Sequence, residues 1–127
     1  MIIGIGVDVV DVPRFQAAII RSPGLSARLF TAEELRQTGG RGHDAVSQAA
    51  RFAAKEAVAK TLGAPAGLRW HDCEILLGDR GKPYLAFTGT VAAAAAEVHA
   101  HIWHLSLSHD GDVAMAFVIA ERSPAAG

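Results

Sequence analysis

Apolar and polar positions alternate at the start of the chain, which predicts a buried β-strand from Ile2 to Val10. The two faces of this strand carry Ile3, Ile5, Val7 and Val9 on one side and Gly4, Gly6 and Asp8 on the other. The glycines leave a groove in which another element can approach the backbone. Asp8 stands at the end of that groove, where an acid is unfavourable unless it is paired or binds a cation.

A helical pattern occupies the middle of the chain and predicts a long central helix from about Asp44 to Leu62. Alanines dominate this segment, which favours a slender helix. Gly63 lies where a C-cap glycine belongs, and Pro65 prevents the helix from continuing.

Charge is concentrated within two turns of this helix. Lys55, Glu56 and Lys60 lie there, and the only other lysine of the chain is Lys82. At about 100° per residue, Phe52 shares a stripe with Glu56 and Lys60, so that a carboxylate and an ammonium group project together beside an aromatic ring. The ordinary interpretation is an exposed ion pair on a solvated helix, and the alternative is a site for a phosphate and its metal.

Capping residues divide the remainder of the first half into shorter helices. Asp11 is suited to cap a helix from about Val12 to Ile20. The spacing of Thr31 and Glu34 matches a capping box, which predicts a further short helix. A loop is expected from Thr38 to Gly42 before the central helix begins.

The second half of the chain is predicted to contain most of the β-structure. Strand patterns occupy His71–Leu77, Tyr84–Phe87, His101–Ser108 and Val113–Ala120. The first two form a hairpin, and the last two are joined by a polar turn at residues 109–112. Between the pairs, Thr90 is expected to cap an alanine-rich helix that runs to about Val98.

Length and charge limit the possible functions. A chain of 127 residues that is 50% hydrophobic suits one domain, which we assign to residues 1–122, with residues 123–127 as a disordered tail. Twelve basic and thirteen acidic residues are interspersed and give a net charge of −1, so neither a nucleic acid nor a membrane is an expected partner. The single Cys73 and the absence of a signal-peptide pattern favour the cytoplasm.

Histidines suggest a second kind of chemistry. His99, His101 and His104 are close in sequence, but alternation places the last two on opposite faces of a strand, which argues against a zinc site. His109 lies at a strand end beside a turn and is a candidate catalytic group, although a lone histidine is more often structural.

Three stretches together resemble the holo-acyl-carrier-protein synthase family, the small bacterial 4′-phosphopantetheinyl transferases. They are GIGVDVVDVPRF at Gly4–Phe15, RFAAKEAVAKTLG at Arg51–Gly63, and the pair GKPY at Gly81–Tyr84 with LSLSHDGDVAMAFV at Leu105–Val118. An aspartate that closes the first strand, FAAKEA, GKP and S-x-S-H are jointly specific. The resemblance implies an α+β fold in which a small antiparallel sheet packs on a long central helix.

The resemblance also implies a reaction. Coenzyme A binds with Mg²⁺, and a serine hydroxyl of an apo acyl carrier protein attacks the β-phosphate, which releases adenosine 3′,5′-bisphosphate. Asp8 and Glu56 match the metal-ligand positions, a donor set that suits Mg²⁺. The implied catalytic residues are Asp8, Glu56, Lys60 and His109. The implied coenzyme contacts are Arg51, Phe52, Lys55, Lys60, Gly63, Gly81, Lys82, Pro83, Ser106, Ser108 and His109.

Several details stay open at this point. Glu56, a metal-bound water or His109 can each take the serine proton, and we favour a metal-bound water that Glu56 positions. The resemblance places Arg14, and more loosely Arg21 and Arg28, on a docking face for the acidic carrier, and it implies a homotrimer with sites between subunits. The alternative functions are a non-catalytic oligomeric module that binds coenzyme A or a nucleotide, and a hydrolase of coenzyme A.

Overall fold

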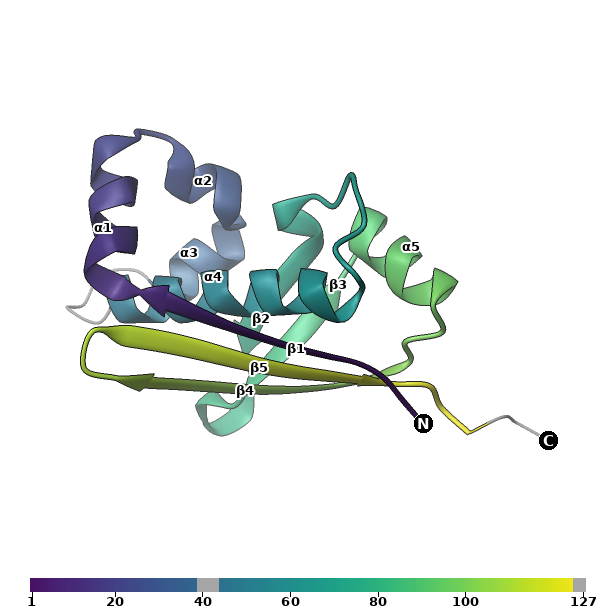
Figure 1. Ribbon diagram of the computed structural model, residues 1–127. Coiled ribbons are helices and arrows are strands. Elements are labelled where there is room, and N and C mark those ends of the chain that lie inside the picture. The colour runs from purple at the N-terminus through teal and green to yellow at the C-terminus, as the bar shows by residue number, and fades with distance from the viewer. Residues whose placement is uncertain (39–43, 125–127) are drawn as a thin grey trace.

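The computed structural model describes residues 1–38 and 44–124, and it has an α+β fold organised around one helix. Helix α4 (Asp44–Thr61) lies along one face of a three-stranded antiparallel sheet (Figure 1). The strand order is β1 (Ile2–Asp11), β5 (Val113–Glu121) and β4 (Ile102–Asp110), so the first strand pairs with the last. This arrangement confirms the predicted fold class and the central helix.

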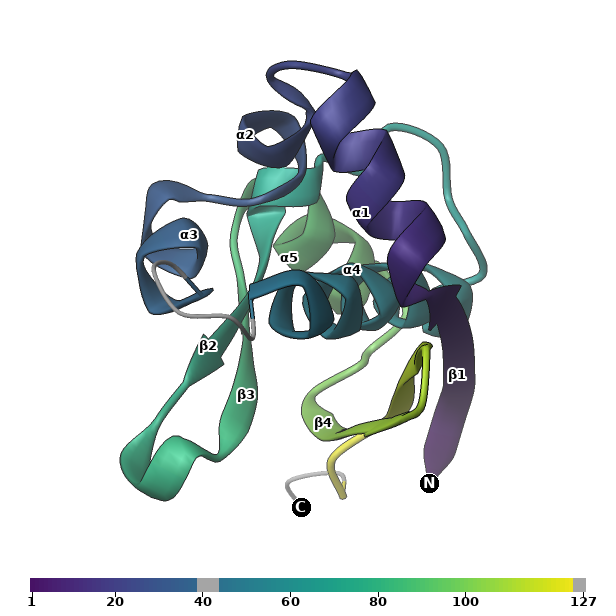
Figure 2. The ribbon, with the colours of Figure 1, turned by 90° about the vertical axis from the view of Figure 1, so that its left-hand side faces the viewer.

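The other elements surround α4. Three short helices precede it at one end of the molecule, and they are α1 (Val12–Arg21), α2 (Leu25–Leu29) and α3 (Ala32–Thr38). A separate hairpin of β2 (Cys73–Leu77) and β3 (Pro83–Phe87) lies on the other side of α4 from β1 (Figure 2), and α5 (Gly89–Glu97) follows it. Of the predicted loop, Thr38 ends α3, and residues 39–42 lie outside the described residues.

Small residues let α4 lie directly on the sheet. Its alanines Ala49, Ala53, Ala54 and Ala57 are fully buried, as are Ala114, Ala116, Val118 and Ala120 of β5. A Cβ atom on Gly6 would lie 2.1 Å from the Ala57 carbonyl oxygen, and one on Gly4 would lie 2.4 Å from the Thr61 carbonyl oxygen. The prediction that the glycines of the first strand form a groove for another element is therefore confirmed, and that element is α4.

The prediction that the first strand is buried is wrong for its bulky face. Alternation along β1 is present, but Ile5, Val7 and Val9 are 56%, 44% and 55% exposed. The glycine face lies against α4 because only that face allows a helix backbone to come close. The outer face of the sheet, continued by Met115 and Phe117 of β5 at 39% and 42% exposure, is an apolar surface.

Two local predictions also need correction. Helix α5 begins one residue before Thr90, with Thr88 at its N-cap position, because the backbone N–H and hydroxyl of Thr90 both donate to Asp72 Oδ2, at 2.8 and 2.7 Å. Strand β4 runs to Asp110, so His109 belongs to the strand and not to the turn.

Ser123, assigned to the tail, contacts His101 through its backbone N–H at 3.1 Å, whereas residues 125–127 lie outside the described residues. Among the described residues, no helix combines the length and apolarity needed to cross a bilayer.

Candidate active site

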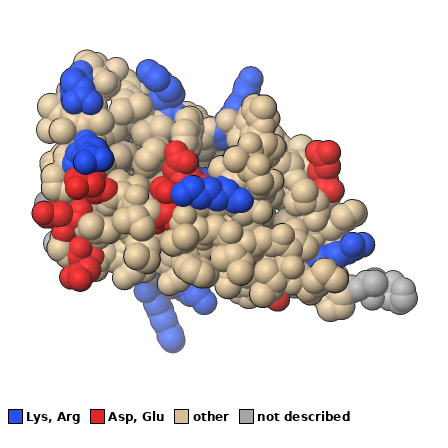
Figure 3. Space-filling view, in the orientation of Figure 1, with Lys and Arg blue, Asp and Glu red and all other residues tan. Residues whose placement is uncertain are grey.

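A charge cluster lies where β1 crosses α4. Lys60 Nζ donates to Asp8 Oδ1 at 2.8 Å and to the Val7 carbonyl oxygen at 3.2 Å. The side chains of Lys60 and Asp8 are 53% and 18% exposed, so the pair is open to solvent on one side. Figure 3 shows acidic and basic side chains in contact near the middle of this face. The structure thus brings together Asp8 and the Glu56–Lys60 stripe, as the family resemblance implies.

Glu56 shares this cluster, and no ion pair to its carboxylate is found among residues 1–38 and 44–124. Burial raises the pKa of its carboxyl group, the nearby Asp8 raises it further, and Lys60 partly offsets both effects. The hydrogen bond from Lys60 to Asp8 raises the pKa of the Lys60 ammonium group, and the negative charge of Asp8 raises it further. Two carboxylates therefore share one ammonium group, and the cluster retains negative charge that favours binding of a further cation.

The donor set of the cluster suits Mg²⁺. This ion commonly takes one or two carboxylates and completes its shell with water and substrate phosphates. Among residues 1–38 and 44–124, no group of three or more His, Cys, Asp and Glu side chains is placed to hold a metal ion. Asp8 and Glu56 are the residues that would hold Mg²⁺, and the remaining positions would stay available for phosphate oxygens.

Two basic residues expected to contact the coenzyme are buried inside the fold. Arg51 is 2% exposed, and it donates to the Ile75 carbonyl oxygen, Ser47 Oγ and Gln37 Oε1 at 2.9, 2.7 and 3.0 Å. Burial lowers the pKa of its guanidinium, an effect that Glu34 partly offsets. Lys55 is 3% exposed, and its ammonium group lies among acceptors of the protein itself. The structure does not bring either charge to Asp8.

Phe52 on α4 and Gly63 just after it flank the cluster. Phe52 is half-buried and stacks on Phe15 of α1, with ring centroids 5.2 Å apart, while Trp70 lies against it at 5.5 Å. Gly63 has a φ of +82°, and its backbone N–H donates to the Lys60 carbonyl oxygen at 3.0 Å. The predicted C-cap glycine is confirmed, and it ends the helix close to Lys60.

The last hairpin divides the other expected contacts between two faces. Ala116 of β5 pairs with Asp8 of β1 on one side and with Leu107 of β4 on the other. His109 lies two residues after Leu107, so its side chain is on the same face of the sheet as that of Asp8. Ser106 and Ser108 alternate with these residues and lie on the apolar outer side. Within one chain, therefore, the structure does not bring the two serines to Asp8.

The GKP segment forms a third region. Gly81 ends the turn at the tip of the hairpin of β2 and β3, and Lys82 and Pro83 lead into β3. Figure 2 shows this hairpin on the side of α4 away from β1. A cavity of about 350 Å³ lies beside it, lined by Lys82, Pro83, Tyr84, Leu85, Trp103, His104 and Leu105. The expected coenzyme contacts thus occupy separate regions of the chain.

The arginines expected to dock the carrier lie at the end formed by α1 and α2. Arg14 and Arg21 belong to α1 and Arg28 to α2, and all three are exposed. Basic side chains stand over these two helices in Figure 3. The structure therefore gathers them on one side of the molecule, next to the aromatic contact between Phe15 and Phe52.

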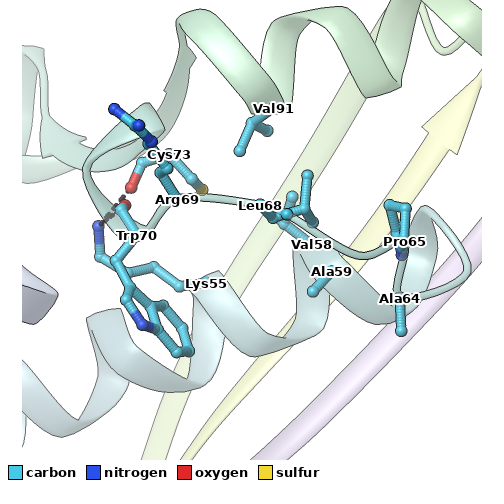
Figure 4. Close-up of a pocket in the computed structure, with 11 residues that line it drawn as sticks. Lys55, Val58, Ala59, Ala64, Pro65, Leu68, Arg69, Trp70, Cys73 and Val91 are labelled. Carbon is cyan, nitrogen blue, oxygen red and sulfur yellow. Dashed lines mark hydrogen bonds between the residues drawn. The ribbon is translucent and has the colours of Figure 1, made fainter.

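A pocket between α4, α5 and the connection that follows α4 was not predicted (Figure 4). Its volume is about 220 Å³, and its lining includes Lys55, Leu68, Trp70 and Cys73. Burial raises the pKa of the Cys73 thiol to about 12, so this cysteine is not a nucleophile at neutral pH. Sequence reasoning also missed Glu34 as the partner of Lys55, although a buried lysine requires an acceptor.

Comparison with known proteins identifies the family. A sequence profile of the 4′-phosphopantetheinyl transferase superfamily matches residues 4–118. The chain belongs to this superfamily. A holo-[acyl-carrier-protein] synthase of Salinispora arenicola is 59% identical over 122 residues, which cover 96% of this chain and all of the relative. Another holo-[acyl-carrier-protein] synthase, from Frankia casuarinae, is 59% identical over 121 residues, 94% of this chain and 98% of the relative.

Solved structures agree with this family assignment. The "Chronobacterium ammoniagenes ACPS-CoA complex" has a TM-score of 0.84 and 29% identity, with 95% of this chain and 98% of that chain covered. The holo-[acyl-carrier-protein] synthase of Neisseria meningitidis has a TM-score of 0.84 and 31% identity, with 96% and 100% covered. This phosphopantetheinyl transferase superfamily member therefore shares the fold of those proteins over nearly its whole length.

Proposed function

We propose that this protein is a holo-acyl-carrier-protein synthase, which transfers the 4′-phosphopantetheine group from coenzyme A to a serine of an apo acyl carrier protein. The observation that carries this proposal is the charge cluster of Asp8, Glu56 and Lys60 in a chain of the superfamily. Relatives at 59% identity bear the same function in their names, and a structural neighbour was solved with coenzyme A.

The chemistry calls for positive charge beside a diphosphate. The serine oxygen forms a bond to the β-phosphorus while the bond to the bridging oxygen breaks, and adenosine 3′,5′-bisphosphate leaves with that oxygen. Mg²⁺ held by Asp8 and Glu56 would neutralise charge on the phosphate oxygens. Lys60 is exposed at the edge of the cluster and adds a positive charge on a flexible stem. Glu56 would orient a water that takes the serine proton.

The active site is completed by a second copy of the chain in this proposal, and the assembly is a homotrimer. Two observations support it: one chain leaves Ser106, Ser108 and the GKP segment apart from Asp8, and the outer face of its sheet is apolar and exposed. Burying that face against other copies removes apolar side chains from water and places the serines at the interface.

The assembly is tested by the mass of the protein in solution. We expect light scattering after size-exclusion chromatography to give three times the mass of one chain. Val7→Lys, on the outer face of the sheet, should dissociate the assembly, whereas Ile20→Lys, which changes an exposed apolar residue of α1, should leave it intact. A wild-type protein that runs as a monomer would exclude the shared site.

Carrier docking is assigned to Arg14, Arg21 and Arg28. Carrier proteins of this kind are acidic, so exposed arginines on α1 and α2 would steer their association in a salt-dependent manner. Arg14→Glu should raise KM for the carrier about tenfold or more at low salt, with little change in KM for coenzyme A. Arg122→Glu, an equal charge change beyond β5, is the control. Equal effects of Arg14→Glu on both substrates would remove it from the docking face.

The transfer reaction is tested by intact-mass spectrometry of an apo acyl carrier protein incubated with the enzyme and coenzyme A, with and without Mg²⁺. A gain equal to one phosphopantetheine group, seen only with the metal, is the expected result. Coenzyme A binding without any gain across several carriers would favour a non-catalytic module. Release of adenosine bisphosphate without a carrier would indicate a hydrolase.

A further inference from the structure

Glu34 is a buried carboxylate that the proposed chemistry does not use. Its side chain is fully buried, and its Oε1 accepts hydrogen bonds from Lys55 Nζ at 2.8 Å and from the Thr31 backbone N–H at 3.0 Å. Its Oε2 accepts one from the Ile75 backbone N–H at 3.0 Å. A charge removed from water this completely is stable only with a full set of partners. The partners of Glu34 come from Thr31, just before α3, from α4 and from β2.

Lys55 closes the same network from the other side. Besides Glu34, its ammonium group donates to the carbonyl oxygens of Trp70, at 3.0 Å, and of Cys73. An ammonium group has three N–H donors, so all of them have acceptors within the protein. Figure 4 shows the Lys55 side chain leaving α4 toward these two carbonyls. A coenzyme phosphate would have to displace one of these acceptors in order to contact Lys55.

The network lies one residue from the candidate metal ligand Glu56. On another side of the same turn, the Ala57 carbonyl oxygen lies against Gly6 of β1, at the distance that excludes a Cβ atom there. Helix α4 is therefore held by β1 on one side and by α3 and β2, through Lys55, on another. Glu56 lies between these two attachments, and its position opposite Asp8 depends on both.

We propose that Glu34 is a positioning residue for the metal-binding carboxylate: through Lys55 it fixes the rotation and axial position of α4, so that Glu56 stays opposite Asp8. Lys55 accordingly acts within the fold and does not contact the coenzyme. This inference rests on the proposed function for the identity of the site, but it concerns residues outside the reacting groups.

The first test is binding of Mn²⁺, used as a probe for Mg²⁺ and followed by electron paramagnetic resonance. Glu34→Gln keeps the shape of the side chain and removes its charge. We expect this variant to weaken Mn²⁺ binding about tenfold, as is common for residues that orient a metal ligand from outside the first shell. Glu74→Gln is the matched control, because Glu74 Oε2 accepts from Thr31 Oγ1 at 2.6 Å in the same region without contacting Lys55. Unchanged Mn²⁺ affinity in a folded Glu34→Gln protein would overturn the proposal.

The second test separates positioning from direct contact, and it also applies if Glu34→Gln does not fold. Lys55→Met alone leaves Glu34 without its cation, whereas Glu34→Leu with Lys55→Met removes both charges. The double variant should recover the thermal midpoint that Lys55→Met loses, because no uncompensated charge stays buried, but it should bind Mn²⁺ as weakly as Glu34→Gln, because the link that fixes α4 is gone. If Lys55 instead contacts a phosphate, Lys55→Met will bind Mn²⁺ like wild type and lose affinity only for coenzyme A, measured by calorimetry, and the proposal fails. These readouts need no carrier, so failure of the transfer reaction in wild type is seen separately.

Discussion

Helix α4 carries two lysines that lie five residues apart in entirely different surroundings. Lys55 is 3% exposed and donates to Glu34 and to two backbone carbonyls, whereas the Lys60 side chain is 53% exposed and donates to Asp8 and to one carbonyl. The first ion pair is balanced and closed to solvent. The second shares its cation with another carboxylate, Glu56, and remains open.

The comparison distinguishes a charge that stabilises a fold from one that can act on a ligand. A buried, balanced pair cannot release a partner without leaving an uncompensated charge, so it holds elements in place. An exposed lysine beside two carboxylates loses little when it moves, and the carboxylates it leaves can bind a stronger cation. We therefore expect substitutions in the two clusters to affect different properties.

The largest effect is expected when a carboxylate of the open cluster, which consists of Asp8, Glu56 and Lys60, is neutralised. Asp8→Asn or Glu56→Gln should reduce the rate of carrier modification more than about a hundredfold, because a principal electrostatic contact of the reaction is lost. The rate is measured by intact-mass spectrometry, and circular dichroism should show an unchanged fold. Asp11→Asn, which retains the cap of α1, is the control on the same strand. Wild-type turnover in Asp8→Asn or Glu56→Gln would remove the metal site.

The two lysines should respond in opposite ways to the same substitution. Lys55→Met should lower the free energy of unfolding by about 3–5 kcal/mol, because Glu34 is left buried without its ion-pair partner. Lys60→Met should leave the thermal midpoint nearly unchanged, raise KM for coenzyme A, and tighten Mn²⁺ binding roughly threefold by removing a competing cation from Asp8. Chemical denaturation and paramagnetic resonance measure these properties. Equal loss of stability in both variants would contradict the comparison.

Asp8, Glu56 and Lys60, which form the open cluster, could be named from the sequence, but the residue pattern alone favoured an ordinary exposed Glu56–Lys60 pair, and the family resemblance paired Asp8 with Glu56. The spacing of Gly4 and Gly6 indicates a groove, Asp8 shares their face, and the helical period places Glu56 and Lys60 on one stripe. A strand and a helix that meet at a glycine groove bring these groups together, and the structure does so.

The closed cluster, which consists of Glu34 and Lys55, was not predictable, since these residues come from distant segments. Glu34 was correctly predicted as part of a capping box, and it accepts from the Thr31 N–H, but its bond to Lys55 spans 21 residues. Similarly, alternation along β1 indicates which side chains share a face but not which face is covered. The outward orientation of Ile5 and Val9 follows from the close approach of α4 to the glycines.

A smaller effect is expected from disturbing the close contact between Gly6 of β1 and the Ala57 carbonyl oxygen of α4. Gly6→Ala places a Cβ atom 2.1 Å from the backbone oxygen of Ala57, so α4 must shift away from β1. This overpacking should cost about 1–3 kcal/mol of stability and weaken Mn²⁺ binding by separating Asp8 from Glu56. Gly78→Ala is the control, because its nearest contact would be 3.4 Å from Tyr84. A stable Gly6→Ala protein with normal Mn²⁺ affinity would show that the helix approach does not set the site.

A pH effect is expected because the open cluster has two carboxylates, Asp8 and Glu56, for one ammonium group, that of Lys60. Because the pKa of Glu56 lies above its ordinary value of 4.5, the folded protein holds this proton more tightly than the unfolded chain, and stability falls as pH rises through the window above 4.5. Glu56→Gln should therefore melt at a higher temperature than wild type at pH 7, and this advantage should vanish below pH 4.5. Mn²⁺ affinity of wild type should decline as acidification protonates Glu56. If Glu56→Gln and wild type melt at the same temperature at pH 7 as well as below pH 4.5, the charge of Glu56 is compensated in the fold, as that of Glu34 is by Lys55. The electrostatic contrast between the two clusters would then be wrong.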